Sequence, residues 1–285
     1  MVSEGGYDKT IKLNSGHEMP IVGLGTFLAT EKDDVEKVVF EAIVNHGYRH
    51  IDTATIYGNE EQIGKALKNA FDNGIKREEL FITTKLWHTD KNDVEGALKT
   101  SLAKLQLNYV DLYLVHWMRP SVDWEKGGVP TCPATHVVWG EMEKLVEKDM
   151  TKSIGVSNCT VPIMWDMLCY AKIKPAINQI ELHPYFQQAK VNEWFKSHDI
   201  YLTAYAPLAN GGWTLRKAEY NNVSVMEEPC IKAIAEAHGK SPAQIVLNFI
   251  ISQQVIVIPK TSTISRLPEN FACNDFKLTE EETNQ

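Results

Sequence analysis

Residues 49–87 have the sequence RHIDTATIYGNEEQIGKALKNAFDNGIKREELFITTKLW, and this stretch decides the fold. A short apolar run at 49–52 is followed by apolar residues at helical spacing over 60–72, and a second short run comes at 80–83. Two strands joined by a helix are expected to pair in parallel, because a parallel connection needs a crossover that returns the chain to the same end of the sheet. The stretch therefore predicts one unit of a parallel α/β sheet.

The same alternation continues along the chain. Short apolar runs occupy residues 21–24, 49–52, 80–83, 112–115, 153–156, 176–179, 201–204 and 255–258. The amphipathic stretches between them include residues 34–45, 60–72, 94–105, 138–148 and 229–238, and Ser241-Pro242 is a typical helix start. Eight such units in 285 residues predict an α/β fold of the closed (β/α)8 TIM barrel type, as a single domain over residues 1–285.

An open, doubly wound sheet is the alternative fold. Its nucleotide-binding form has the pattern G-x-G-x-x-G after the first strand, and residues 23–28, GLGTFL, lack the third glycine. The barrel is therefore favoured.

Three further segments are expected at the two faces of the barrel. Residues 10–19 predict a β-hairpin that turns at Ser15-Gly16 and closes the N-terminal face as a plug. The connections 118–135 and 207–228 are too long for plain barrel loops. Because both follow strand ends, they are expected over the C-terminal face.

The composition excludes several classes of protein. With 37 acidic against 29 basic residues, nucleic acid is not expected as a partner, although a local basic site for a phosphate is compatible with this balance. Five cysteines without a CxxC pair predict neither a disulfide framework nor a zinc site. The first ten residues lack a signal-peptide pattern, and no apolar run reaches membrane-spanning length. A cytoplasmic protein without membrane contact is expected.

Polar side chains close seven of the eight apolar runs. They are Asp52, Lys85, His116, Ser157 with Asn158, Gln179, Tyr205 and Lys260. One polar residue at a strand end is as often structural as functional. The whole set meets at the C-terminal face, where barrel enzymes carry their active sites, and so predicts a site there.

Eight stretches make the chain similar to a known family. They are MPIVGLGT (19–26), YRHIDTATIYGNE (48–60), FITTKLW (81–87), DLYLVHW (111–117), GVSN (155–158), NQIELHPY (178–185), TAYAPLA (203–209) and IPKTSTISRLPEN (258–270). In order and spacing the chain resembles the aldo-keto reductase superfamily, and within it the aldose reductase and xylose reductase group. The resemblance implies an NAD(P)H-dependent oxidoreductase that reduces aldehydes and ketones, including open-chain aldoses such as xylose or glucose, to alcohols.

The resemblance assigns Asp52, Tyr57, Lys85 and His116 as catalytic residues, with Tyr57 as the proton donor. Hydride transfer builds negative charge on the carbonyl oxygen, so the site needs a proton donor and electrostatic support there. The free pKa of tyrosine, about 10, is too high for efficient donation near neutrality. An ammonium about 4 Å away contributes roughly 4 kcal/mol at an effective dielectric of 20, so Lys85 is expected to lower the Tyr57 pKa. Asp52 is expected to hold Lys85 charged, and His116, as a neutral imidazole, to orient the carbonyl group.

The resemblance also implies a nicotinamide cofactor. Its carboxamide is expected to bind Ser157, Asn158 and Gln179, and its ring to stack on Tyr205. The expected cofactor residues are Thr26, Ser157, Asn158, Gln179, Tyr205, Leu208, Lys260, Thr261, Ser262, Arg266, Glu269 and Asn270.

The phosphate end of the cofactor is expected after the last strand. Residues 260–263 are expected to open a helix whose N-terminal amides attract anions, with Arg266 on its first turn. Lys260 and Arg266 suit the 2′-phosphate that NAD lacks, so NADPH is predicted, with NADH as a secondary cofactor. By resemblance, Glu269 and Asn270 contact the adenine, and residues 207–228, with Gly211 and Gly212 as hinges, form a flap over the pyrophosphate.

Phe27, Trp87 and Trp117, together with His116, are expected to line an apolar substrate pocket. Aldose reductases usually carry tryptophan where this chain has Phe27, which puts the pocket shape in doubt. The chain also ends in KLTEEETNQ (277–285), where family members continue through another helix and a loop that closes the pocket. The sequence is therefore either a piece of a longer chain or that of a barrel with an open site, and without the segment substrate affinity and selectivity are expected to suffer.

Two other functions compete with the reductase. A non-catalytic nucleotide-binding or structural relative, like the channel subunits and lens crystallins of the family, would keep the fold without turnover, but the intact catalytic set argues against it. A barrel hydrolase has no support, because no paired carboxylates or metal cluster close the strands. His46, His50 and His88 lack metal-ligand spacing, so no bound metal is expected, and His183 is interpreted as structural. The expected partner is a small carbonyl substrate, and the protein is expected to be a monomer or a dimer.

Overall fold

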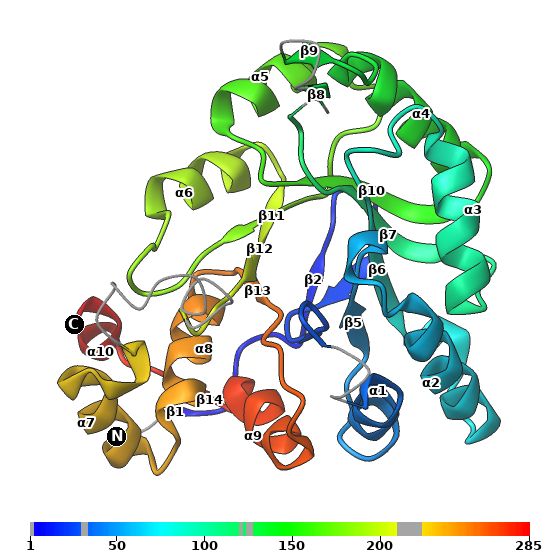
Figure 1. Ribbon diagram of the computed structural model, residues 1–285. Coiled ribbons are helices and arrows are strands. Elements are labelled where there is room, and N and C mark those ends of the chain that lie inside the picture. The colour runs from blue at the N-terminus through cyan, green and yellow to red at the C-terminus, as the bar shows by residue number, and fades with distance from the viewer. Residues whose placement is uncertain (1–2, 30–33, 120–121, 124–127, 210–223) are drawn as a thin grey trace.

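Eight parallel strands form a closed ring at the centre of the molecule (Figure 1). The computed structural model describes residues 3–29, 34–119, 122–123, 128–209 and 224–285. The strands of the ring are β4 (Leu24–Gly25), β5 (His50–Asp52), β6 (Phe81–Leu86), β7 (Val110–Val115), β10 (Thr151–Ser157), β11 (Ile177–Glu181), β12 (Tyr201–Tyr205) and β13 (Ile256–Val257). Each pairs in parallel with the next along the chain.

The ring closes between its first and last strands. The Gly23 amide donates to the carbonyl oxygen of Val257 (2.8 Å), and the Val257 amide donates to that of Ile21 (2.9 Å). Because no strand edge is left open at this seam, the sheet is a barrel and the predicted (β/α)8 fold is confirmed.

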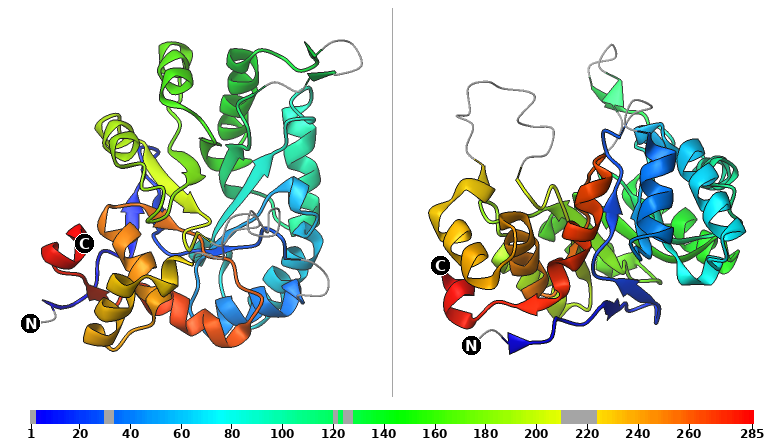
Figure 2. Two further views of the ribbon diagram at one scale, coloured as in Figure 1. Left: turned by 60° about the vertical axis from the view of Figure 1, so that its left-hand side comes forward. Right: turned by 90° about the horizontal axis from the view of Figure 1, so that it is seen from below.

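Helices surround the ring on its outer side (Figure 2). They are α1 (Val35–Val44), α2 (Glu60–Asp72), α3 (Val94–Leu105), α4 (Thr135–Glu147), α5 (Val161–Tyr170), α6 (Ala189–Ser197), α7 (Pro229–His238), α8 (Pro242–Ser252) and the short α9 (Leu267–Phe271) and α10 (Glu280–Asn284). The helices predicted at 60–72, 94–105 and 229–238 match α2, α3 and α7 to the residue. Helix α4 begins at Thr135 rather than at residue 138. The predicted start at Ser241 is confirmed, because its hydroxyl accepts a hydrogen bond from the Gln244 amide.

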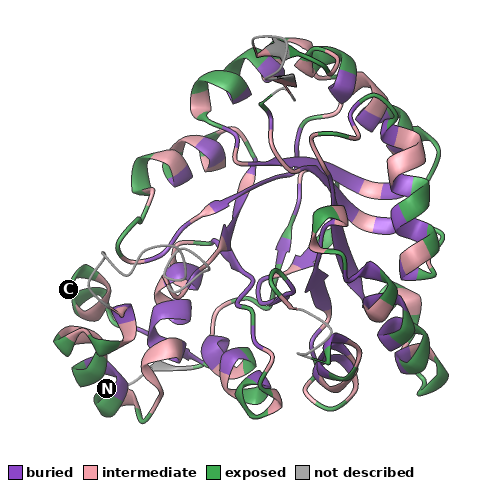
Figure 3. Cartoon of the chain, in the orientation of Figure 1, coloured by how far each residue is buried: buried purple, intermediate pink, exposed green. Residues whose placement is uncertain are grey.

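The strands are the most buried part of the molecule (Figure 3). All six residues of β6 are buried, whereas α2 buries one face, which carries Ile63, Ala66 and Leu67. A parallel strand inside a ring of helices is covered on both sides. This explains why the strands appear in the sequence as continuous apolar runs rather than as alternating ones.

The N-terminal hairpin covers one face of the barrel. Strands β2 (Thr10–Lys12) and β3 (Glu18–Pro20) pair antiparallel. At their turn, the Asn14 side-chain amide donates to the carbonyl oxygens of Pro175 and Asp199, both at 2.9 Å. These two carbonyls precede β11 and β12, so the hairpin lies against the N-terminal ends of the strands and the predicted plug is confirmed.

The start and the end of the described chain lie side by side (Figures 1 and 2). Strand β1 (Ser3–Glu4) pairs antiparallel with β14 (Phe276–Lys277). The Asn248 side-chain amide of α8 donates to the carbonyl oxygens of Cys273 and Phe276, each at 2.8 Å. The segment that follows α9 is therefore held to the barrel by hydrogen bonds from within the fold.

The two long connections follow β7 and β12. In the first, β8 (Val122–Asp123) pairs with β9 (Val129–Pro130). The second is described only up to residue 209 and from residue 224, so the predicted flap with its Gly211 and Gly212 hinges lies outside the described residues. Among the helices described, none has the length and apolar character needed to cross a membrane.

Candidate active site

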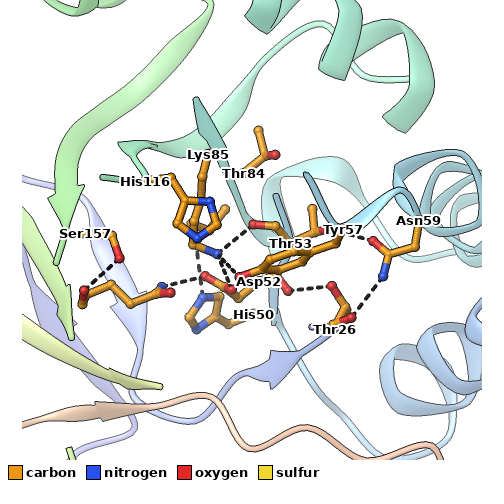
Figure 4. A network of polar contacts seen from close by, with 12 residues as sticks. Thr26, His50, Asp52, Thr53, Tyr57, Asn59, Thr84, Lys85, His116 and Ser157 are labelled. Carbon is orange, nitrogen blue, oxygen red and sulfur yellow. Dashed lines mark hydrogen bonds and ion pairs between the residues drawn. The ribbon is translucent and has the colours of Figure 1, made fainter. Parts of the chain in front are cut away.

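A buried ion pair lies at the C-terminal ends of β5 and β6 (Figure 4). Lys85 Nζ is 2.5 Å from Asp52 Oδ1, and the two side chains are 0% and 2% exposed. Lys85 also donates to the backbone oxygen of Thr53 (2.7 Å), and the Gln179 side-chain amide donates to Asp52 Oδ2 (2.7 Å). Because β5 and β6 are paired neighbours, the fold itself brings these two charges together. Both carboxylate oxygens of Asp52 are thus held by hydrogen bonds.

Tyr57 lies directly beside this ion pair. It ends a 3-10 turn, η2 (Thr55–Tyr57), that leaves β5, and its hydroxyl oxygen is 3.4 Å from Lys85 Nζ. The turn is anchored because the Thr55 hydroxyl donates to the backbone oxygen of Lys85 (3.1 Å). The next residue, Gly58, has a φ of +70°, a left-handed backbone that glycine adopts without strain and that leads the chain into α2. The predicted meeting of Asp52, Tyr57 and Lys85 is present in the fold.

His116 follows β7 and closes the other side of the cluster. Its ring centroid is 5.8 Å from that of Tyr57 and 5.1 Å from that of Trp87. Burial, together with the Lys85 charge, lowers the pKa of His116 to about 3. The imidazole is therefore neutral at neutral pH, as expected from the sequence. Its Nδ1 atom is buried and has no hydrogen-bond partner among the described residues.

The pKa of Tyr57 contradicts the expectation from the sequence. Lys85 was expected to lower it, but burial and the nearby Asp52 charge raise the pKa of Tyr57 well above its ordinary value. The reason is that Asp52 lies closer to Lys85 than Tyr57 does and offsets most of its field, while burial disfavours the phenolate. Burial also lowers the pKa of Lys85. Tyr57 is thus a fully protonated hydroxyl.

The residues expected to bind a nicotinamide carboxamide surround the cluster. The Ser157 hydroxyl donates to the Gln179 backbone oxygen (2.8 Å), and the Asn158 side chain donates to the backbone oxygen of His116 (3.0 Å). The Tyr205 hydroxyl donates to Asn158 Oδ1 (2.9 Å), and its ring is half-buried. Since Gln179 uses its nitrogen on Asp52, its carbonyl oxygen is the group left to accept from a cofactor amide. Hydroxyl, amide and ring together fit a nicotinamide.

The residues expected at the phosphate end lie after β13. Lys260 and Arg266 are exposed, and Thr261 and Ser262 line a small cavity together with Thr26. The expected helix start is wrong in detail, because residues 260–263 are not its first turn. Instead, a 3-10 turn, η5 (Ile264–Arg266), follows them and α9 comes after it, so that Arg266 lies on η5. The helix is displaced because Pro268 occupies the first turn of α9, where proline is tolerated.

The remaining predicted cofactor residues flank the same region. Glu269 and Asn270 lie on α9, where Asn270 is buried and Glu269 half-buried. Leu208 follows β12 and packs against the main core. The structure thus places the predicted set in two groups, one beside Tyr57 and one after β13.

Phe27 contacts Tyr57, Trp87 contacts His116, and Trp117 directly follows His116 in the chain; these three residues are called the aromatic wall. Phe27 is 51% exposed, and its ring centroid is 5.0 Å from that of Tyr57. Trp87 and Trp117 are half-buried at the ends of β6 and β7. His183, interpreted from the sequence as structural, contacts the Glu181 carboxylate (3.2 Å). No cluster of three or more metal-binding side chains occurs within the described ranges.

Sequence reasoning missed a layer of buried polar residues behind the cluster. The Thr53 hydroxyl donates to Asn59 Oδ1 (2.9 Å), and the Asn59 side-chain amide donates to the Thr26 backbone oxygen (2.9 Å). The Thr84 hydroxyl donates to the buried Glu60 carboxylate (2.7 Å). Asn59 and Glu60 end the stretch 48–60, so the sequence contained a signal for them, but only the structure shows that they link the start of α2 to the ends of β4 and β5 and to β6.

The fold and the site together define a barrel enzyme that can transfer a proton at its C-terminal face, where a buried charge pair lies beneath a protonated tyrosine. The Aldo/keto reductase family model matches residues 21–285. The chain therefore belongs to the aldo/keto reductase family and is an NAD(P)H-dependent oxidoreductase.

Several relatives are similar over most of their length. The NADP-dependent D-sorbitol-6-phosphate dehydrogenase of Malus domestica is 41% identical, over 96% of this chain and 91% of the relative. The methylglyoxal reductase DkgA of Yersinia pestis is 43% identical, over 95% of this chain and 89% of the relative. Among solved structures, the aldose reductase of Schistosoma japonicum matches with a TM-score of 0.87 and 37% identity, over 97% of this chain and 90% of that one.

Proposed function

We propose that this protein reduces aldehydes and ketones, including open-chain aldoses such as xylose or glucose, with NADPH as the reductant and Tyr57 as the proton donor. The observation that carries the proposal is the buried chain from Asp52 through Lys85 to the Tyr57 hydroxyl, with 2.5 Å and 3.4 Å between successive polar atoms.

The proton transfer follows from these contacts. Bound NADPH would supply the hydride to the carbonyl carbon. Tyr57 gives its proton to the carbonyl oxygen, where negative charge develops. The phenolate left behind lies beside the Lys85 ammonium, so its charge is stabilised at the moment it forms. Asp52, fixed by Gln179, keeps Lys85 charged and in place.

His116 positions the substrate. Its neutral imidazole carries one N–H, which can donate a hydrogen bond to the carbonyl oxygen without adding a second positive charge. Phe27, Trp87 and Trp117 line the pocket around the same oxygen in this proposal. In a drier site the Lys85 charge acts on the phenolate more strongly.

The cofactor residues form two groups in this proposal. Ser157, Asn158 and Gln179 hold the carboxamide, and the half-buried Tyr205 ring stacks on the nicotinamide. Lys260 and Arg266 bind the 2′-phosphate, with Thr261 and Ser262 beside them. Thr26 and Leu208 contact the cofactor between these ends, and Glu269 and Asn270 contact the adenine.

Turnover by the purified protein tests the proposal. We expect NADPH to be consumed on addition of benzaldehyde or xylose, followed by its absorbance, and the corresponding alcohol to appear in equal amount. NADPH binding, measured separately by fluorescence, shows whether the cofactor site is intact. Tight NADPH binding without turnover of any aldehyde or ketone would contradict the proposal and favour a non-catalytic nucleotide-binding protein.

A further inference from the structure

Basic side chains gather beside the two tryptophans of the aromatic wall. The His88 ring centroid is 4.4 Å from that of Trp87, and the Arg119 guanidinium carbon is 5.7 Å from the ring centroid of Trp117. Lys91 donates to the backbone oxygens of Trp117 (2.8 Å) and Arg119 (2.7 Å). Lys91 therefore links the segments that follow β6 and β7, and His88 and Arg119 lie on these two segments.

This basic cluster of His88, Lys91 and Arg119 lies close to the reacting centre. The Trp87 ring that contacts His88 also contacts His116, with 5.1 Å between ring centroids. The charge of His88 also acts on His116. It is the third cause of the lowered His116 pKa, smaller than burial and the Lys85 charge. Two successive ring contacts thus separate His88 from the imidazole beside Tyr57.

Burial and neighbouring positive charges lower the pKa of two members of the cluster. Lys91 is only 4% exposed, and burial lowers its pKa, with Arg119 acting in the same direction and the Cys132 thiol opposing it. Burial lowers the pKa of His88 too, helped by Arg119 and Lys91 and opposed by Asp90.

Within the described part of the chain, neither Lys91 nor Arg119 has a carboxylate within ion-pair distance. A buried cation without a counter-ion costs stability, and Lys91 is such a cation, so an anion held by the exposed Arg119 beside it would be favoured there.

We propose that Arg119, supported by Lys91 and His88, forms a subsite for an anionic group, a phosphate or a carboxylate, at the far end of an aldehyde substrate. This inference rests on the proposed function, because it takes the aldehyde to lie at Tyr57 and His116. An arginine fork binds either oxyanion with two parallel hydrogen bonds. The ring contacts from His116 through Trp87 to His88 lead from the reacting centre to this cluster, and the proposal places the far end of an open-chain aldose phosphate there.

Matched pairs of aldehydes test the subsite at saturating NADPH. One pair is 4-carboxybenzaldehyde and its neutral methyl ester, and the other is glucose 6-phosphate and glucose. We expect a higher kcat/KM for the anionic member, arising mainly from a lower KM and weakened by added salt. A higher kcat/KM for the anionic member of both pairs indicates a subsite for anions in general. A higher kcat/KM for the anionic member of the sugar pair alone indicates a subsite for phosphate.

The variant Arg119→Gln removes the charge but keeps a polar side chain. We expect it to reduce the ratio of kcat/KM for anionic over neutral aldehyde by about 10- to 100-fold, the usual range for a hydrogen bond between charged groups. Arg119→Glu is expected to reverse the preference. The matched control is Lys190→Gln on α6, a lysine with 96% of its side chain exposed, which should keep the wild-type ratio.

The outcomes separate the subsite from the proposed function. Equal kcat/KM for acid and ester and for both sugars, unaltered in Arg119→Gln, would overturn the subsite and leave the reductase standing. If no aldehyde is reduced, the proposed function fails. The subsite is then tested separately, by the quenching of tryptophan fluorescence on binding of 4-carboxybenzaldehyde. Quenching by the acid but not the ester, lost in Arg119→Gln, supports it, and equal quenching by both contradicts it.

Discussion

The Tyr57 hydroxyl keeps its proton in the resting site because the buried pair beneath it is nearly neutral as a whole. Burial and the Asp52 charge disfavour the phenolate, and Lys85, paired with Asp52 at 2.5 Å, does not reverse this in the resting site. An acid with a raised pKa transfers its proton only when a stronger base appears, and the carbonyl oxygen becomes such a base as hydride arrives. Stabilisation by Lys85 then applies to the phenolate produced rather than to the resting tyrosine.

The sequence could predict which residues form this cluster but not its electrostatics. Asp52 and Lys85 end neighbouring strands, so their proximity follows from the barrel. The hydrogen bond from Gln179 to Asp52 joins residues 127 positions apart, and no spacing argument could have found it. The direction of the Tyr57 pKa depends on burial and on distances of a few ångströms, which is why it was predicted with the wrong sign.

A residue-scale prediction concerns the choice of cofactor. The double variant Lys260→Met with Arg266→Ala should weaken NADPH binding by about 10- to 100-fold or more, because each charged hydrogen bond to a phosphate contributes about 1.5–3 kcal/mol. NADH binding should barely change, because NADH lacks the 2′-phosphate. Fluorescence titration of both cofactors measures this, with Lys190→Met as the control. Equal losses for NADPH and NADH would mean that Lys260 and Arg266 do not recognise the 2′-phosphate.

At the scale of the elements, neighbouring strands place Asp52 and Lys85, whereas a turn places Tyr57. The apolar runs predicted all eight strands of the ring, because strands covered on both faces leave a clear apolar signal. The 3-10 turn that carries Tyr57 has no such signal. It is held by a hydrogen bond from the Thr55 hydroxyl to the Lys85 backbone oxygen.

The turn after β13 is a second turn that the apolar pattern of the sequence did not predict. The polar run at residues 260–263 was expected to begin a helix, and the Thr261 hydroxyl instead accepts a hydrogen bond from the Thr263 amide (3.0 Å). A side chain that bonds to its own neighbouring backbone competes with helix formation. The helix consequently begins only at α9, and Arg266 approaches the site from η5.

At the scale of the whole molecule, the barrel carries two histidines that are neutral because they are buried. Burial lowers the pKa of His50 to about 4, and burial with Lys85 lowers that of His116 to about 3. In the unfolded chain both would titrate near their ordinary pKa of about 6.5. Between these values the unfolded state binds more protons than the folded state, so stability falls as the pH drops below about 6.5.

The variant His116→Gln tests this linkage. Most carboxylates remain ionised between about pH 7 and pH 5. Over this range each such histidine lowers the free energy of unfolding by about 2 kcal/mol, at about 1.36 kcal/mol per pKa unit, because it is protonated only in the unfolded chain. The free energy of unfolding of the wild-type protein should therefore fall by about 2 kcal/mol more than that of His116→Gln over this range. Urea unfolding at both pH values measures the difference. An equal loss in the two proteins would show that His116 is not held neutral by the fold.

The central claim is that the Tyr57 hydroxyl supplies the proton, and the variant Tyr57→Phe tests it most directly. Tyr170→Phe is the matched control, because the Tyr170 hydroxyl, on α5, has no hydrogen-bond partner among the described residues. With NADPH and benzaldehyde we predict that Tyr57→Phe lowers kcat by about a hundred- to ten-thousand-fold, the range of general acid catalysis, while NADPH still binds and Tyr170→Phe keeps wild-type turnover. A Tyr57→Phe variant with wild-type kcat would contradict the account.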